Sequence, residues 1–165
     1  MKHGLIHIYI GDGHGKSPAA LGKAVLSAAA GANVVIIQFL KGKGVHDSEL
    51  LSRLEPEIKI FRFEKSDVNF DELSEEKKTE EIINIKNGLN FAKKVLTTGG
   101  CDLLILDEVL GLIDNQIITV EDLKSMLDVR DKETDIIMTG IALNDEICEL
   151  ADEVSRIETL KIKER

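Results

Sequence analysis

Residues 11–17, with the sequence GDGHGKS, combine glycines, a lysine and a hydroxyl at a spacing that favours phosphate binding. The segment follows the apolar run 5–10 and precedes a helix-like run that starts near residue 19. Strand, glycine-rich turn, lysine, hydroxyl and helix is the order of a phosphate-binding loop. Glycines let successive backbone N–H groups face one concavity, and the following helix adds its positive N-terminal end. Because Lys16 adds a full charge and Ser17 can bind Mg²⁺, this loop predicts a site for the polyphosphate of a nucleotide.

The loop departs from the common G-x-x-x-x-G-K-[ST] pattern in its length and in one residue after the lysine. Between Gly11 and Gly15 it has one residue fewer than that pattern. Pro18 has no N–H group, so the predicted cradle has one donor fewer, although proline is well tolerated in the first turn of a helix. Because the γ-phosphate cradle of nucleotide hydrolases needs the longer loop, the shortening argues against simple hydrolysis.

An acidic pair, Asp107 and Glu108, directly follows the apolar run 103–106. Proteins with phosphate-binding loops place a carboxylate at the end of such a strand, beside the metal ion of the nucleotide. Ligands of open α/β sheets bind at the carboxyl ends of the strands. We therefore expect Ser17, Asp107 and Glu108 to lie together as metal-binding residues. The alternative is the solvated acidic end of an ordinary strand.

Weaker signals lie at other strand ends. Gln38 stands near the end of one apolar run, Lys41 follows it, and Thr139 ends another run. These positions suit ligand contact, but they are also typical of ordinary strand-end turns. His14 could donate a hydrogen bond to phosphate or could lie on the surface as part of a turn.

Apolar, β-branched runs alternate with helix-period segments along the chain. We expect strands at residues 5–10, 34–39, 58–63, 103–107, 135–139 and 154–162. We expect helices from 15 to about 30, from 71 to about 97, and after N-caps at Thr119 and Asn144, with Ser74 a further N-cap. Near-continuous apolar strands between helices favour a parallel sheet covered on both faces. The predicted fold is α/β, a P-loop NTPase-like three-layer sandwich with a mostly parallel sheet of about six strands.

Composition limits the classes of protein to which the chain can belong. Its 165 residues are 43% hydrophobic and 31% charged, which suits one globular domain over residues 1–165. The net charge of −9 argues against nucleic-acid binding, and no apolar run is long enough to span a membrane. Cys101 and Cys148 lie outside metal-ligand spacing, so we expect small buried core residues in a reduced, cytoplasmic setting.

Taken in order, these pieces resemble the ATP:corrinoid adenosyltransferases, which adenosylate cob(I)alamin or cob(I)yrinic acid a,c-diamide. The shortened loop of that family is matched by residues 11–20, and its Gln-Phe-x-Lys-Gly motif by residues 38–42, with Glu49 following. Its Leu-Asp-Glu segment is matched by residues 106–115, and its closing motifs by residues 139–140 and 149–154. The similarity extends over nearly the whole chain.

The resemblance implies that the chain holds ATP and Mg²⁺ at the loop and transfers the 5′-deoxyadenosyl group to the Co(I) of a corrinoid. It implies Lys16 and Glu108 as catalytic residues, with Lys16 neutralising phosphate and Glu108 holding Mg²⁺ together with Ser17 and Asp107. The residues implied to contact nucleotide or corrinoid are Gly11, Asp12, Gly13, His14, Gly15, Lys16, Ser17, Gln38, Lys41, Glu49 and Thr139. Its partners would be these small molecules, and a homodimer is compatible with the sequence.

The chain also departs from the family around the expected triphosphate. Where the family has a second loop lysine, an asparagine, a second threonine and the arginine of Thr-Gly-Arg, this chain has His14, Asp12, Pro18 and Ile141. Each charge-assisted hydrogen bond lost is worth roughly 1.5–3 kcal/mol. Two alternatives therefore stay open. One is a nucleotide- or corrinoid-binding homologue without transfer activity, and the other is a P-loop NTPase or kinase.

Overall fold

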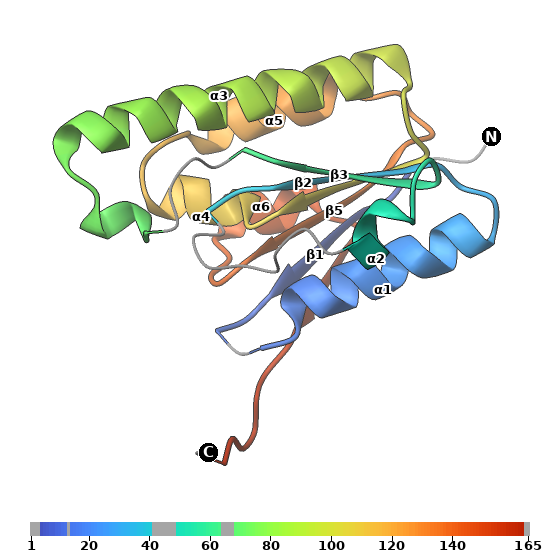
Figure 1. The fold of residues 1–165 in the computed structure, drawn as a ribbon, viewed down its shortest axis with the longest axis horizontal. Coiled ribbons are helices and arrows are strands. Elements are labelled where there is room, and N and C mark those ends of the chain that lie inside the picture. Colours follow the sequence, from blue (N-terminus) through green and yellow to red (C-terminus); the bar gives the residue numbers. More distant parts are fainter. Residues whose placement is uncertain (1–3, 13, 41–48, 64–67, 164–165) are drawn as a thin grey trace.

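The computed structural model describes residues 4–12, 14–40, 49–63 and 68–163 (Figure 1). The strands are β1 (Ile6–Ile10), β2 (Val34–Gln38), β3 (Ile58–Arg62), β4 (Leu103–Asp107), β5 (Asp135–Gly140) and β6 (Glu153–Arg156). The α-helices are α1 (Lys16–Ala29), α2 (Glu49–Ser52), α3 (Glu75–Thr98), α4 (Val109–Asp114), α5 (Val120–Asp128) and α6 (Asp145–Leu150), and a 3₁₀ turn, Phe70–Glu72, precedes α3.

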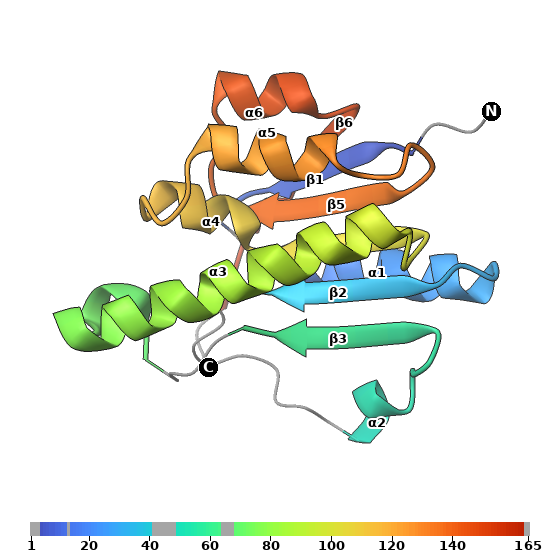
Figure 2. The ribbon, with the colours of Figure 1, turned by 90° about the horizontal axis from the view of Figure 1, so that it is seen from above.

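These strands form one parallel sheet in the order β3-β2-β4-β5-β1-β6 (Figure 2). β1, the strand before the glycine-rich loop, pairs with β5 on one side and β6 on the other. β1 to β5 lie within one residue of their expected bounds. The predicted α/β fold with a parallel sheet is therefore confirmed. The expectation of a single domain over residues 1–165 stays a prediction.

Helices cover both faces of the sheet, as the apolar strands require. α1 packs on one face, whereas α3, α4, α5 and α6 form the layer on the other (Figure 1). Alternate residues of each strand pack against opposite helix layers. In β4, Leu104 and Leu106 pack on the α3 side, and Leu103 and Ile105 pack on the α1 side. All five residues of β4 are therefore buried, and this central strand ends at the acidic pair.

The expected helix caps are present. The Ser74 side chain accepts a hydrogen bond from the N–H of Lys77, and Asn144 caps α6 in the same way. Thr119 and Asp122 form a reciprocal capping box at α5. α3 is long but polar, and within the described residues no helix combines the length and apolar character needed to cross a bilayer.

The last strand is much shorter than the sequence predicts. Instead of residues 154–162, β6 ends at Arg156, and residues 157–163 have no regular structure. The reason is topological, because β1, the neighbour of β6, ends at Ile10, where the chain turns into the loop. Beyond that point a further strand has no neighbour to pair with. We call residues 157–160 the C-terminal strap.

Two other expectations need correction. The sequence did not predict α4 (Val109–Asp114), which starts directly after the acidic pair. Cys101 is buried as expected, but Cys148 is exposed, because α6 turns Ile147 toward the core instead. Burial raises the pKa of the Cys101 thiol to about 11, so this thiol stays protonated and unreactive at neutral pH.

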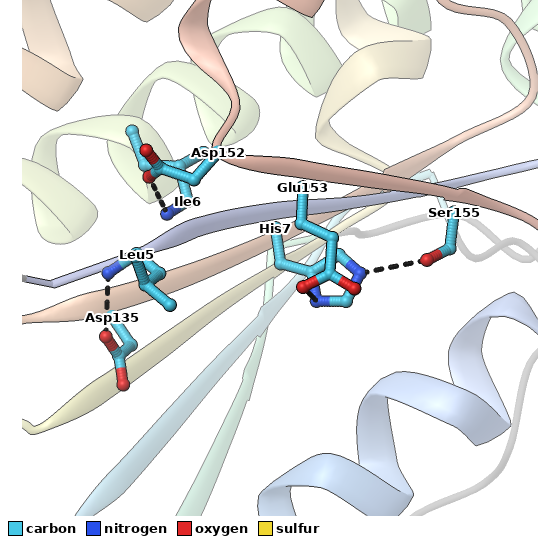
Figure 3. A network of polar contacts seen from close by, with 7 residues as sticks. All are labelled: Leu5, Ile6, His7, Asp135, Asp152, Glu153 and Ser155. Carbon is cyan, nitrogen blue, oxygen red and sulfur yellow. Dashed lines mark hydrogen bonds and ion pairs between the residues drawn. The ribbon is translucent and has the colours of Figure 1, made fainter.

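Polar contacts fasten β1 to its two neighbours (Figure 3). Near the start of β1, carboxylates of Asp135 and Asp152 accept hydrogen bonds from the N–H groups of Leu5 and Ile6, each at 2.8 Å. Further along β1, the His7 ring lies between two side chains of β6. Its Nε2 is 3.1 Å from the Ser155 hydroxyl, and its Nδ1 is 3.8 Å from Glu153.

Acid is expected to weaken the folded state through His7. Burial lowers the pKa of His7 below its ordinary value of 6.5, although Glu153 opposes this shift. The unfolded chain then binds a proton more readily than the folded one, so this contribution to stability is present above about pH 6.5 and is lost as the pH falls below it. Urea unfolding between pH 7.5 and 5 should show a shallower pH dependence in His7→Gln. Equal slopes in the two proteins would contradict this role for His7.

Candidate functional site

The parallel sheet brings the ends of β1, β5 and β4 to one edge. β1 leads into the glycine-rich loop, β5 ends at Gly140, and β4 ends at Asp107. β1 pairs with β5 and β5 pairs with β4, so the three ends are neighbours. The loop and the acidic pair, which are far apart in the sequence, therefore meet at this edge.

The glycines of the loop have backbone angles that other residues rarely adopt. Gly11 has φ of 141° and Gly15 has φ of 123°. Gly15 is the N-cap of α1, and no side chain of the described residues caps this helix, so its first turn offers backbone N–H groups to a ligand. Pro18 sits in that first turn without disturbing it, because the N–H of Ala19 still donates to the carbonyl of Gly15 at 2.8 Å.

Lys16 and Glu108 form an ion pair at the end of the loop. The Lys16 Nζ lies 3.3 Å from the Glu108 Oε1, and their side chains are only 10% and 20% exposed. A pair this sheltered from water interacts more strongly than one on the open surface. The one lysine charge of the loop is therefore already balanced by a carboxylate.

Asp107 is the centre of a buried hydrogen-bond network. Its Oδ1 accepts a hydrogen bond from the Ser17 hydroxyl at 2.9 Å and another from the Thr139 hydroxyl at 2.7 Å. The Thr139 hydroxyl in turn accepts the N–H of Glu108 at 2.7 Å. Asp107 is 2% exposed and Thr139 is 0% exposed. The network thus fixes residues of α1, β4 and β5 relative to one another.

Glu108 has a left-handed backbone, with φ of 63° and ψ of 19°. Such a conformation costs a non-glycine residue roughly 1–3 kcal/mol and is found mostly at functional sites. Here it turns the chain sharply from β4 into α4. Gly140 allows α4 to pack close, because a Cβ at Gly140 would lie 2.4 Å from the Leu110 Cβ.

A cavity of about 150 Å³ adjoins the network on the α1 side of the sheet. Ser17, Gln38 and Asp107 give it a polar end, and apolar side chains such as Ile36 and Leu51 line the rest. Gln38 pairs in register with Asp107 and lines this cavity together with Ser17.

The other expected site residues have different outcomes. The backbone N–H of His14 donates to the Thr159 hydroxyl at 3.0 Å, so in this structure it is already engaged. Asp12 lies on the wall of a separate cleft beside the loop. Glu49 begins α2. Gly13 and Lys41 lie outside the described residues.

Sequence reasoning missed the C-terminal strap as part of the site. The Ile157 carbonyl lies so close to Gly11 that a Cβ there would be 2.1 Å from its oxygen, and the Ile157 side chain packs near Gly15. The N–H of Ile157 donates to the carbonyl of Ile10 at 2.8 Å. No local pattern could show these contacts, because they depend on β6 lying beside β1.

Residues 2–164 match the model of the family described as ATP:corrinoid adenosyltransferase BtuR/CobO/CobP. This match covers nearly all of the chain. The chain belongs to this adenosyltransferase family. The resemblance inferred from the loop and the acidic pair is thereby confirmed.

Two curated relatives named corrinoid adenosyltransferases agree with this assignment. The corrinoid adenosyltransferase of Escherichia coli K12 is 28% identical over 160 residues, which cover 97% of this chain and 79% of that protein. The corrinoid adenosyltransferase CobA of Salmonella typhimurium LT2 is equally similar, at 28% over 160 residues with the same shares. An uncharacterised protein of Nostoc sp. PCC 7120 is 30% identical over 151 residues, covering 84% of this chain and 39% of its own length.

Among solved structures, ATPases 2 and 3 of EssC from Geobacillus thermodenitrificans match with a TM-score of 0.49 and 18% identity. That match covers 93% of this chain and 32% of the other. A similarity this low supports no comparison of sites.

The oxygen atoms at the acidic pair are the kind of ligand that Mg²⁺ takes in proteins. Among the described residues, no group of three or more His, Cys, Asp or Glu side chains forms a cage for a metal ion. Mg²⁺ in nucleotide sites is typically held by one or two carboxylates together with substrate phosphates and water. Ser17, Asp107 and Glu108 offer that kind of incomplete, all-oxygen set.

Proposed function

We propose that this protein transfers the 5′-deoxyadenosyl group of ATP to the Co(I) centre of a corrinoid and releases triphosphate. The electron pair of Co(I) forms the cobalt–carbon bond at C5′, and triphosphate leaves with the electron pair of the broken C5′–oxygen bond. The chain therefore needs no nucleophile of its own. It must position the two substrates and neutralise the charge that develops on the leaving group.

The observation that carries this proposal is the meeting of Lys16, Ser17, Asp107 and Glu108 at one sheet edge in a member of this family. Before ATP binds, Lys16 and Glu108 neutralise each other across 3.3 Å. With MgATP bound, Lys16 would instead bind the phosphates and Glu108 would help to hold the metal ion. In the protein without ATP, the ion pair therefore keeps both side chains at the site, and neither charge is left unpaired in this sheltered place.

Ser17, Asp107 and Glu108 would hold the Mg²⁺, which supplies positive charge for the phosphate oxygens of the leaving triphosphate. Because Thr139 is fully buried and bonded to both Asp107 and the Glu108 amide, its part is to position these groups. The first-turn N–H groups of α1 add donors for phosphate.

Gln38, Lys41 and Glu49 remain proposed contacts on the nucleoside or corrinoid side. The cavity beside Gln38 supports this for the first of them, since it opens next to Ser17. Whether the corrinoid is cob(I)alamin or cob(I)yrinic acid a,c-diamide stays open, and a homodimer stays a prediction. The reduced cobalt that the reaction needs favours a cytoplasmic location.

Product analysis tests the proposal. Under anaerobic, strongly reducing conditions, the protein with MgATP and either corrinoid should yield the adenosylated corrinoid and intact triphosphate in equal amounts. Omitting the corrinoid should stop triphosphate release. ADP and free phosphate as products would show a nucleotide hydrolase instead, and ADP with a phosphorylated acceptor would show a kinase.

One observation favours a second candidate, a homologue that binds but does not transfer. The loop has lost donors at Pro18 and His14, and the His14 amide is engaged by Thr159. Such a protein would bind MgATP in titration calorimetry and yet form no adenosylated product with either corrinoid.

A further inference from the structure

A cleft of about 420 Å³ lies beside the glycine-rich loop. It is lined by Gly11 and Asp12 of the loop, by Ile141 after β5, and by Arg156, Glu158 and Thr159. Three different chain segments thus converge beside the turn that is proposed to hold triphosphate.

Arg156 is held firmly at this place. It is the last residue of β6, and its Cα pairs in register with Ile10, the residue directly before the loop. The next residue, Ile157, donates its N–H to the carbonyl of Ile10 at 2.8 Å. Two residues further on, the Thr159 hydroxyl accepts the N–H of His14 at 3.0 Å. Ile157 and Thr159, which follow Arg156, are therefore bonded to the chain on both sides of Gly11.

The charges around the proposed triphosphate site are mostly negative, so a second cationic side chain would stabilise the bound triphosphate. A bound triphosphate brings several negative charges, and Asp12, Asp107 and Glu108 add more. Against these charges the described part of the proposed site sets only Lys16, which is paired with Glu108 before ATP binds, together with the two charges of Mg²⁺. Ile141, at the end of β5, contributes an exposed apolar side chain to the same cleft.

Arg156 can supply this second positive charge. Its side chain is exposed and lines the cleft, and it forms no ion pair or hydrogen bond with the described part of the chain. A guanidinium is always charged and can bind two phosphate oxygens at once.

We propose that Arg156, at the end of β6, binds the triphosphate of ATP from the cleft that it shares with Ile141 at the end of β5. This inference rests on the proposed function and adds a phosphate-binding residue to it. The structural role of the C-terminal strap would then be to hold Arg156 beside the loop.

Binding of inorganic tripolyphosphate with Mg²⁺, measured by titration calorimetry, tests the proposal without any corrinoid. Arg156→Ala should bind about tenfold or more weakly than the wild type, and the loss should shrink at high salt. Arg156→Lys should keep part of the affinity. Lys132→Ala removes one positive charge near the opposite sheet edge, before β5, and should bind like the wild type.

Moving the arginine from position 156 to position 141 is the most discriminating test of this proposal. Adding Ile141→Arg to Arg156→Ala should restore most of the lost affinity, because the two positions face the same cleft. Unchanged binding in Arg156→Ala, while Lys16→Ala abolishes binding, would overturn this inference and leave the proposed function standing. If the wild type binds neither tripolyphosphate nor ATP, the proposed function fails and the inference fails with it.

Discussion

Lys16→Ala is expected to slow adenosyl transfer by roughly a hundredfold to a thousandfold, the usual cost of removing one preorganised group from a developing charge. Affinity for MgATP should fall as well, by about tenfold or more. The physical reason is that Lys16 is the one lysine of the loop and lies within 3.3 Å of the Glu108 carboxylate proposed to hold Mg²⁺. Single-turnover kinetics with reduced corrinoid, together with calorimetric titration of MgATP, measure both effects.

Lys23→Ala is the matched control for this prediction. Lys23 lies on the same helix and carries the same charge, but its side chain is exposed and belongs to no part of the proposed site. It should leave both the rate and the affinity within about twofold of wild type. If Lys16→Ala and Lys23→Ala behave alike, Lys16 has no special role and the loop is not the phosphate site.

Gly11→Ala is expected to lower the free energy of unfolding by about 3 kcal/mol or more. Two independent causes add at this position. Its φ of 141° strains any residue with a side chain, and the new Cβ would lie 2.1 Å from the Ile157 carbonyl oxygen, which is backbone and cannot rotate away. The strap must then leave the loop, so triphosphate binding should weaken together with stability. Urea unfolding and calorimetry on the same protein would show both losses.

Gly22→Ala is the matched control, because here the same substitution is expected to raise the free energy of unfolding. Gly22 lies within α1, and a Cβ there would meet nothing within 4 Å. Alanine in a helix interior is more favourable than glycine by about 0.5–1 kcal/mol, so this variant should become more stable. A Gly11→Ala protein as stable as wild type would show that the strap does not lie against the loop.

The local elements were predictable because their signals are local. Five apolar runs gave β1 to β5 to within one residue, and Ser74, Thr119 and Asn144 marked helix starts through side chains that cap backbone N–H groups three residues away. The loop was recognisable for the same reason, since its glycines, Lys16 and Ser17 are consecutive.

α4 and the end of β6 were not predictable in this way. α4 follows a left-handed residue, Glu108, for which the sequence gives no warning because glutamate is not a residue that favours that conformation. The sequence predicts a last strand that extends to residue 162, yet a strand needs a neighbour to pair with, and β1 ends at Ile10.

The sequence by itself determined which functional groups are present. These are a tight glycine turn with one lysine and one hydroxyl, and a strand ending in two carboxylates. Only the tertiary structure decided how those groups are paired, with Lys16 against Glu108 and Asp107 between Ser17 and Thr139. It alone placed Arg156 and the strap beside the loop. The physical reason is that spacing along a chain fixes local geometry, whereas the order of strands in a sheet depends on how all the helices and strands pack together.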